Sequence, residues 1–245
     1  MKKAHLLEVL STVQGEGIYA GVRQVFLRFH GCNLRCRYCD TQEALSSPPS
    51  TCRVEKEAGR REFFHLPNPL SVNKVIQVVS SLLEVPHHSL SLTGGEPLLH
   101  VEFLKAFLPC MKRLDTLIYL DTNGILASNL KEVLSYIDII SMDVKLDSVA
   151  GCGERIEQHL EFLKIALEKE VFLKVVLTSE TDSAELKKSL ELLSIKREIP
   201  VVLQPVSPIF NLSPPSAKRL LYYQQLALSY FNDVRNYPFM KHLYA

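Results

Sequence analysis

Residues 25–41 read VFLRFHGCNLRCRYCDT, and this stretch joins an apolar run to a cysteine-rich loop. Its first part, Val25–His30, contains β-branched and aromatic residues, which predicts a buried strand. Cys32, Cys36 and Cys39 follow in a C-x3-C-x2-C arrangement. The stretch therefore predicts a strand whose carboxyl end carries three thiols on one tight loop.

Similar apolar runs recur along the chain, and each is followed by a longer segment with helical spacing. The predicted strands are Val25–His30, Ser89–Thr93, Leu117–Thr122, Ile137–Val144, Val171–Leu177 and Pro200–Gln204. The predicted helices are Leu70–Leu83, Val101–Arg113, Asn129–Ser135, Glu154–Glu168, Asp182–Ile195 and Ser216–Tyr230. This alternation is typical of parallel α/β proteins. A closed barrel would have about eight strand–helix units, so we expect either an open doubly wound sheet or an incomplete, curved barrel.

The composition is that of a folded globular protein, with 245 residues of which 47% are hydrophobic and 22% charged. Its 28 Lys and Arg against 27 Asp and Glu leave a net charge of +1, which gives no general field for nucleic acid. We find no secretory signal and no apolar run of the roughly 18–20 residues that span a bilayer. We therefore expect a cytoplasmic protein with no nucleic-acid or membrane partner, whose six cysteines are reduced.

Residues 46–69 interrupt the alternation. They read SSPPSTCRVEKEAGRREFFHLPNP, a proline-containing segment of mixed charge, which predicts an inserted loop or small subdomain. The segment is too short to be an independent domain. We therefore expect a single domain over residues 1–245, with residues 231–245 as a C-terminal tail.

The clustered cysteines indicate a metal centre before disulfides, because thiolates are soft ligands that favour zinc or iron–sulfur clusters. Three thiolates leave one iron of a cubane [4Fe-4S] cluster free to bind a small molecule. The alternative is a structural zinc whose fourth ligand would come from His30, Asp40 or Cys52. Outside that zinc alternative, Cys52, Cys110 and Cys152 are interpreted as ordinary small apolar residues.

Polar residues follow the predicted strands at the edge where α/β proteins place their active sites. Thr93-Gly94-Gly95-Glu96-Pro97 would let the backbone approach a ligand closely, although alone it also suits a turn into a helix. Asp121 and Asn123 serve either as caps or as ligand contacts.

Arg28 is flanked by apolar residues in the first predicted strand, where its charge is costly to bury without an anion. We expect it to clamp a substrate carboxylate through two hydrogen bonds. The alternative is a structural salt bridge to Glu16 or Glu8.

The C-x3-C-x2-C loop, with Tyr38 before its third cysteine, and the TGGEP segment together resemble the radical S-adenosylmethionine (SAM) enzymes. The resemblance implies an incomplete parallel (β/α)6-type barrel with a short insertion after the cluster loop. It also implies a [4Fe-4S] cluster on Cys32, Cys36 and Cys39 that binds SAM and cleaves it reductively to a 5′-deoxyadenosyl radical. The implied SAM site consists of Tyr38, Cys39, Asp40, Gly95, Ser141, Met142, Asp143, Gln204, Pro205, Val206 and Ser207.

Within that superfamily, the QGEG run at residues 14–17, the F-x-R-x-x-G-C run at residues 26–32 and the following Asp40-Thr41 resemble the 7-carboxy-7-deazaguanine synthase family. That resemblance implies conversion of 6-carboxy-5,6,7,8-tetrahydropterin to 7-carboxy-7-deazaguanine with loss of ammonia, in 7-deazapurine (queuosine) biosynthesis. The implied mechanism is hydrogen abstraction from C6 of the pterin, ring contraction, and return of the hydrogen to regenerate SAM.

The same resemblance implies a set of binding residues and partners, but it assigns no side chain as a catalytic acid or base. The implied substrate-binding residues are Val13, Gln14, Gly15, Arg28 and Thr93, with Glu16 as a weaker candidate. Thr41 would hold Mg2+ through its hydroxyl. A homodimer and an electron donor such as flavodoxin or ferredoxin are also implied.

Other interpretations remain open at this point. Family members often end in a Pro-Gln-x-His-Lys type segment, whereas Pro238–His242 has the basic pair reversed, so substrate contacts from the tail are not carried over. An activating enzyme for a glycyl-radical protein would share the cysteine loop and a TGGEP-like turn. A zinc-stabilised binding module would keep the cysteines without using SAM.

Overall fold

The computed structural model describes residues 2–207 and 212–236, and the tail segment Pro238–His242 lies outside them. Within the described residues, ten strands form one sheet, and β1 (Lys3–Ala4) pairs separately with β6 (Leu70–Ser71). In spatial order the sheet contains β12 (Val234–Asn236), β11 (Val201–Pro205), β10 (Glu170–Leu177), β9 (Ile139–Val144), β8 (Leu117–Thr122), β7 (Ser89–Gly94), β3 (Arg23–Phe29), β2 (Leu6–Val13), β4 (Thr51–Glu55) and β5 (Phe63–Pro67). Neighbouring strands from β3 to β12 run parallel.

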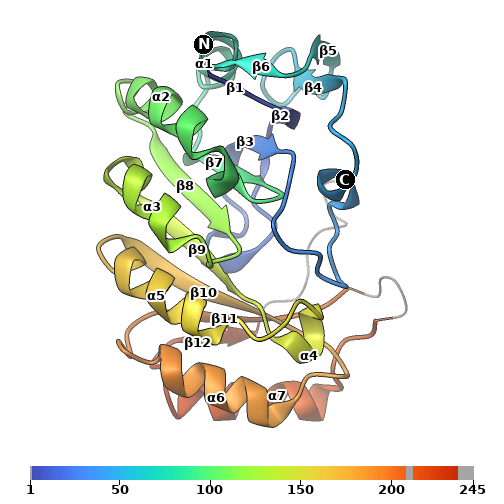
Figure 1. The fold of residues 1–245 in the computed structure, drawn as a ribbon, viewed down its shortest axis with the longest axis vertical. Helices are drawn as coiled ribbons and strands as arrows, with labels where there is room; N and C mark the ends of the chain where they lie inside the picture. Colours follow the sequence, from blue (N-terminus) through green and yellow to red (C-terminus); the bar gives the residue numbers. More distant parts are fainter. Residues whose placement is uncertain (1, 208–211, 237–245) are drawn as a thin grey trace.

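The helices pack in a row on the outer side of this sheet (Figure 1). They are α1 (Val72–Leu82), α2 (Val101–Lys112), α3 (Ala127–Val133), α5 (Ile156–Ala166), α6 (Ser183–Leu193) and α7 (Ala217–Leu228), with the short α4 (Asp147–Ala150) after β9. A doubly wound sheet would carry helices on both faces. The expected incomplete (β/α)6-type barrel is therefore confirmed, and the doubly wound alternative is wrong.

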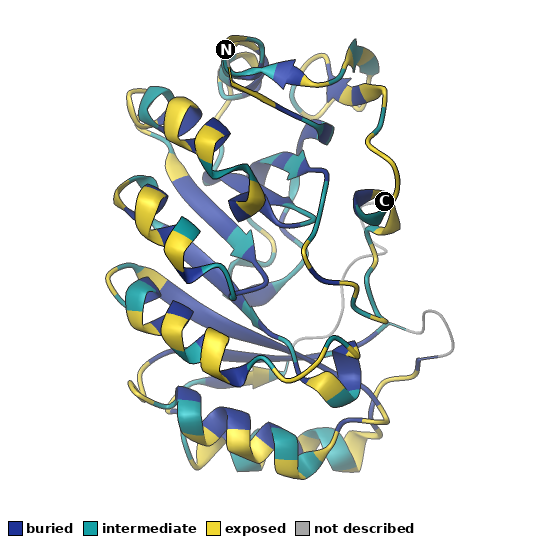
Figure 2. Cartoon of the chain, in the orientation of Figure 1, coloured by how far each residue is buried: buried dark blue, intermediate teal, exposed yellow. Residues whose placement is uncertain are grey.

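The helices form where apolar residues recur every three or four positions, and a polar side chain caps the first turn of α1, α6 and α7. On α6, Leu186, Leu190 and Leu193 are buried, and the Asp182 side chain accepts a hydrogen bond from the Ala184 N–H. Figure 2 shows the same division on the other outer helices, whose exposed residues face away from the sheet. The predicted strands and helices are all present, with ends that shift by at most two residues.

The N-terminal segment and the insertion form strands that the sequence did not predict. Leu6–Val13 is β2, which pairs antiparallel with β3. Within residues 46–69, β4 pairs parallel with β2, and β5 pairs antiparallel with β4. The insertion therefore extends the edge of the main sheet.

A small apolar cluster closes the inside of the barrel below the strand ends. Tyr119 and Phe172 are buried there, and Ile18 and Tyr19 pack against them. Gly17 precedes these two residues with φ 71°, and a Cβ at this position would lie 2.6 Å from the Phe172 ring. Glycine is required here because both the backbone conformation and the close approach exclude a side chain. In the described part of the chain, no helix has the length and apolarity needed to cross a membrane.

Candidate active site

A cavity of 540 Å³ opens at the carboxyl ends of the parallel strands. We call it the active cavity. The residues predicted to bind substrate, SAM or metal that line it are Val13, Gln14, Gly15, Arg28, Cys32, Cys36, Tyr38, Cys39, Asp40, Thr41, Thr93, Gly95, Asp143, Gln204, Val206 and Ser207. Ser141, Met142 and Pro205 are not among the lining residues, and the first two are buried in β9. The weaker candidate Glu16 also lines the active cavity.

The cysteine loop is fixed by backbone contacts to the TGGEP segment. The Gly31 N–H donates to the Ala44 carbonyl over 3.0 Å, and the Glu96 N–H donates to the Gly31 carbonyl over 2.8 Å. A Cβ on Gly95 would lie 2.0 Å from the Gly31 oxygen. Only glycine fits this backbone-to-backbone contact, so the glycines of TGGEP have a structural function in holding the loop.

The three thiols of this loop fit an iron–sulfur cluster with three protein ligands. All three are free and line the active cavity. The Cys32 sulfur accepts hydrogen bonds from the Leu34 N–H at 3.5 Å and from Asn123 Nδ2 at 3.9 Å. Burial raises the pKa of this thiol above its ordinary value, and the Leu34 N–H opposes that shift. Among the residues that the structure describes, no group of three or more His, Cys, Asp or Glu converges on a single-ion site.

Two of the suggested fourth ligands for zinc are engaged elsewhere. His30 Nε2 lies 3.1 Å from the Ser46 carbonyl, and Cys52 is fully buried in β4. The third, Asp40, accepts a 2.9 Å hydrogen bond from the Thr41 hydroxyl. The surroundings therefore favour the cluster over a closed zinc site.

Cys152 lies beside the cysteine loop, which the sequence analysis missed. Its thiol is hydrogen-bonded to that of Cys36; this bond raises the pKa of Cys36 and lowers the pKa of Cys152 to about 7. Arg37 holds the two segments together, because its N–H and Nε donate to the carbonyls of Ala150 at 2.9 Å and Val149 at 3.3 Å. The available signal was the position of Gly151-Cys152-Gly153 shortly after a predicted strand end.

Arg28 forms the salt bridge that was considered as the alternative to a substrate clamp. Its Nε lies 2.8 Å from Glu8 Oε1, and Arg53 contacts the other oxygen of the same carboxylate. Burial acts to raise the pKa of Glu8, but Arg28 and Arg53 outweigh it and hold that pKa below its ordinary value. Glu8 thus fixes Arg28 at the wall of the active cavity.

A buried lysine that the sequence analysis did not select lies at the centre of the strand ends. Lys174 Nζ is 2.8 Å from Glu16, 3.1 Å from Asp143 and 3.4 Å from Asp121, and its side chain is 6% exposed. Lys145 adds a second cation, 2.6 Å from Asp143. The available signal was a lone charge inside the apolar run Val171–Leu177.

Mutual attraction favours the charged forms of Lys174 and Asp143 in this network. Burial alone would lower the pKa of Lys174, but Asp121, Asp143 and Glu16 hold it well above its ordinary value. Burial would likewise raise the pKa of Asp143, but Lys145 and Lys174 hold it low. The Lys174–Glu16 pair also ties the QGEG loop to β10, and so fixes the loop over the active cavity.

Glu96 of TGGEP is fully buried and braces two turns. Its carboxylate accepts hydrogen bonds from the Leu98 N–H at 3.1 Å, the Thr122 hydroxyl at 2.8 Å and the Asn123 N–H at 2.8 Å. Burial raises the pKa of Glu96 to about 7, although these donors oppose the shift.

A Glu96→Gln variant is expected to be less stable, because its amide NH2 would face a buried donor, at a cost of about 1–3 kcal/mol. Between the ordinary carboxyl pKa and about pH 7, the folded protein binds a proton on Glu96 that the unfolded chain has released. This proton therefore adds to the free energy of unfolding at low pH, and its contribution is lost as pH rises through about 7.

Urea unfolding of both proteins from pH 5.5 to 8 measures this effect. The wild-type free energy of unfolding is expected to fall by roughly 2 kcal/mol relative to the variant over that range. If the free energies of unfolding of the two proteins differed by the same amount at every pH, the raised pKa of Glu96 would be contradicted.

Sequence and structure comparisons agree on the family. A model of the radical SAM superfamily matches residues 26–193. The 7-carboxy-7-deazaguanine synthase of Geobacter sulfurreducens is 40% identical over 239 residues, covering 96% of this chain and 94% of that protein. The enzyme of the same name from Methanothermobacter thermautotrophicus is 32% identical, covering 85% and 84%.

The crystal structure of QueE from Escherichia coli is similar in fold, with a TM-score of 0.58 at 19% identity, covering 96% of this chain and 94% of that one. Both of the relatives named above are called synthases, and neither is called an activating enzyme. The comparisons therefore do not support the glycyl-radical alternative. The chain belongs to the radical SAM superfamily and, within it, to the 7-carboxy-7-deazaguanine synthase family.

Proposed function

We propose that this protein is a 7-carboxy-7-deazaguanine synthase, a carbon–nitrogen lyase of 7-deazapurine (queuosine) biosynthesis. It would convert 6-carboxy-5,6,7,8-tetrahydropterin to 7-carboxy-7-deazaguanine and ammonia. The observation that carries the proposal is that one cavity is lined both by the three loop cysteines and by the QGEG loop with Arg28. Family membership at 40% identity over almost the whole chain supports the same reaction.

Cys32, Cys36 and Cys39 would hold the [4Fe-4S] cluster through their thiolates. When bound, the cluster and SAM supply a 5′-deoxyadenosyl radical. The protein's part is to orient SAM and substrate and to exclude water. We propose that SAM lies along Tyr38, Asp40, Gly95, Asp143 and the segment from Gln204, with Ser141, Met142 and Pro205 supporting that wall from behind.

Arg28 is placed to bind the substrate carboxylate, because Glu8 accepts a hydrogen bond from its Nε and, among the described residues, its two Nη groups have no hydrogen-bond partner. Thr93 also lines the active cavity, and its hydroxyl donates to Asp121 over 3.2 Å. Its oxygen can then accept a hydrogen bond from the pterin ring.

Gln14 acts as a positioning residue in this proposal. Its side-chain amide donates to Gln24 over 3.1 Å and accepts from the Glu16 N–H over 3.0 Å. These bonds shape the loop so that Val13 and Gly15 present backbone groups to the substrate. A Cβ on Gly15 would meet nothing within 4 Å, so the cavity beside this backbone is open.

Mg2+ would be bound at Thr41, with Asp40 beside it. Their side chains are 2.9 Å apart, and both line the active cavity next to the cysteine loop. Hydroxyl, carboxylate and substrate oxygens form the hard ligand set that Mg2+ prefers. The ion would neutralise charge on the substrate carboxylate during the ring contraction.

A Thr41→Ala variant is expected to need about tenfold more Mg2+ for half-maximal activity, as suits the loss of one ligand. Titrating Mg2+ at saturating SAM and pterin measures the shift. Thr51→Ala is the matched control, since Thr51 is exposed on β4 outside the active cavity. An unchanged Mg2+ requirement in Thr41→Ala would assign the ion to other ligands.

We further propose that the whole chain works as one domain in a cytoplasmic homodimer that receives electrons from a flavodoxin or ferredoxin. Family membership supports this, and α7 offers exposed apolar side chains for a partner, with Leu221 64% and Tyr222 52% exposed. Light scattering of the purified protein measures its mass directly. A monomer at micromolar concentration would remove the dimer from the proposal.

The reaction itself is tested by anaerobic turnover. The protein is reconstituted with iron and sulfide and mixed with SAM, reductant, Mg2+ and the pterin, and products are followed by liquid chromatography and mass spectrometry. We expect 7-carboxy-7-deazaguanine. SAM cleavage to 5′-deoxyadenosine without any change in the pterin would keep the superfamily and overturn the substrate.

A further inference from the structure

A second cavity, of 920 Å³, lies against the loop that joins β4 to β5. We call it the outer cleft. The charged residues that line it are Arg23, Lys56, Arg60, Arg61, Glu57 and Glu84. Four cationic side chains therefore face two carboxylates, which makes the outer cleft a favourable place for an anion.

Two of these cations have only exposed carboxylate partners. Arg60 lies 3.7 Å from Glu57 and Lys56 lies 3.6 Å from Glu62, and all four side chains are more than half exposed, so solvent screens both attractions. Among the described residues, the Arg61 guanidinium has no ion-pair or hydrogen-bond partner, and it lies 5.5 Å from the centre of the Phe63 ring. Arg61 is therefore available to an incoming anion.

The loop that carries Arg61 has a fixed conformation. The Glu55 carboxylate, 1% exposed, accepts hydrogen bonds from the N–H groups of Ser11 at 2.7 Å, Gly59 at 3.1 Å and Arg61 at 2.8 Å. Arg61 itself has φ 60°, a conformation that non-glycine residues seldom adopt. A Cβ on Gly59 would lie 2.8 Å from the Arg23 guanidinium, so this glycine makes room for a second cation.

The two cavities meet at Arg61. They share Thr12, Val13 and Arg61, of which Arg61 alone is charged. On the inner side lie Arg53 and Arg28, which are both paired with Glu8. The Arg53 guanidinium lies 4.5 Å from the centre of the same Phe63 ring that Arg61 approaches. A series of guanidiniums thus leads from the outer cleft to the arginine proposed to hold the substrate carboxylate.

We propose that the outer cleft is a first binding site for the anionic heterocyclic carboxylate, and that Arg61 passes this ligand to the active cavity. The inference rests on the proposed function, because the ligand is the substrate of that reaction. A guanidinium can donate two hydrogen bonds to a carboxylate, and an exposed guanidinium does so without the burial that would hold the ligand permanently. This suits a residue that releases its ligand further inward. The insertion between the cysteine loop and α1 thereby acquires a function in substrate capture.

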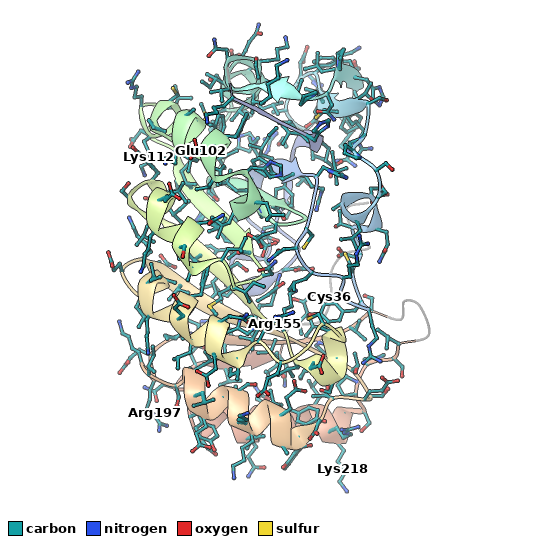
Figure 3. All side chains as sticks on the ribbon, in the orientation of Figure 1. Cys36, Glu102, Lys112, Arg155, Arg197 and Lys218 are labelled. Carbon is teal, nitrogen blue, oxygen red and sulfur yellow. The ribbon has the colours of Figure 1, made fainter. Side chains whose placement is uncertain are left out.

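Steady-state kinetics of Arg61→Gln test the proposal in the reconstituted enzyme. KM for the pterin is expected to rise about tenfold, as for the loss of one charge-assisted hydrogen bond, while kcat changes much less and KM for SAM is unchanged. Raising the ionic strength is expected to lower kcat/KM of the wild type more than that of the variant. Arg197→Gln is the control, since Arg197 is exposed far from the cysteine loop (Figure 3).

Equilibrium binding supplies a readout that does not depend on turnover. The carboxamide analogue of the pterin lacks the charge, so it is expected to bind wild type and Arg61→Gln equally, whereas the carboxylate is expected to lose about tenfold in the variant. Equal pterin KM and equal carboxylate affinity in both proteins would overturn the outer cleft as a binding site. Failure of the wild type to convert the pterin would instead overturn the proposed function. If inorganic phosphate competed equally with pterin binding in the wild type and in Arg61→Gln, that result would count against capture by Arg61.

Discussion

Replacing Cys36 with alanine is expected to abolish the cluster and the reaction together. A cubane cluster with three protein thiolates loses one of them, and neither remaining cysteine of the loop can take its place. We expect less than one third of the wild-type iron after reconstitution, and a loss of turnover of at least about a thousandfold, because the cofactor supplies the chemistry. Iron analysis and the visible absorption of the anaerobic protein measure the first effect.

Cys110→Ser is the matched control, because Cys110 lies on α2 outside the active cavity. It is expected to keep full iron and activity. Cys152 requires a second comparison, since its thiol is beside Cys36. If Cys36→Ala kept its cluster and the Cys36→Ala/Cys152→Ser double variant lost it, Cys152 would be a substitute ligand, and the assignment of three ligands would need revision.

Replacing Lys174 with methionine is expected to destabilise the fold by about 3–5 kcal/mol, which is large for one substitution. The change removes the cation that contacts Glu16, Asp121 and Asp143, and Lys145 stays paired with Asp143. The half-buried carboxylates that Lys174 contacts then lose its positive charge and repel each other in a medium of low polarity. Urea unfolding of the purified full chain at pH 7.5 measures the loss.

The double variant Lys174→Met/Asp121→Asn is expected to regain part of the lost stability, because the second change removes one uncompensated charge. Lowering the pH is expected to reduce the penalty as well. Burial raises the pKa of Asp121 above its ordinary value, so this carboxyl binds a proton in the folded state before it does so in the unfolded chain. Lys164→Met, at an exposed position of α5, serves as the control and is expected to change stability by less than about 0.5 kcal/mol. If Lys174→Met had the same free energy of unfolding as the wild type, the network around Lys174 would contribute little to stability.

The sheet and its outer helices could be predicted because their signals are local. A run such as Leu117–Thr122 carries its strand signal within six residues, and the structure gives the same bounds. Leu6–Val13 was missed because Glu8, Ser11 and Thr12 interrupt its apolar residues. Two of these have partners elsewhere in the fold: Glu8 binds Arg28 and Arg53, and the Ser11 hydroxyl lies 2.8 Å from His87.

The residues of the active cavity could be predicted where they belong to a contiguous motif. They could not be predicted where the site is formed by segments that are distant in the sequence. The cysteine loop and TGGEP each carry their own pattern. Lys174 was not selected because its partners come from the QGEG loop, β8 and β9, and a lone lysine in a strand has no pattern of its own. Arg53 and Arg61 were likewise not selected, because a charged insertion looks like a solvated surface until the sheet places it beside β2.

The central claim is that one cavity brings SAM and the C6 position of the pterin together. Turnover of a substrate deuterated at C6, with mass spectrometry of the SAM recovered afterwards, tests it most directly. The proposed hydrogen abstraction and return predict deuterium in the recovered SAM and formation of 7-carboxy-7-deazaguanine. Product formation with no deuterium in SAM or 5′-deoxyadenosine would contradict the account, because the hydrogen would then leave C6 by a route that the shared cavity does not explain.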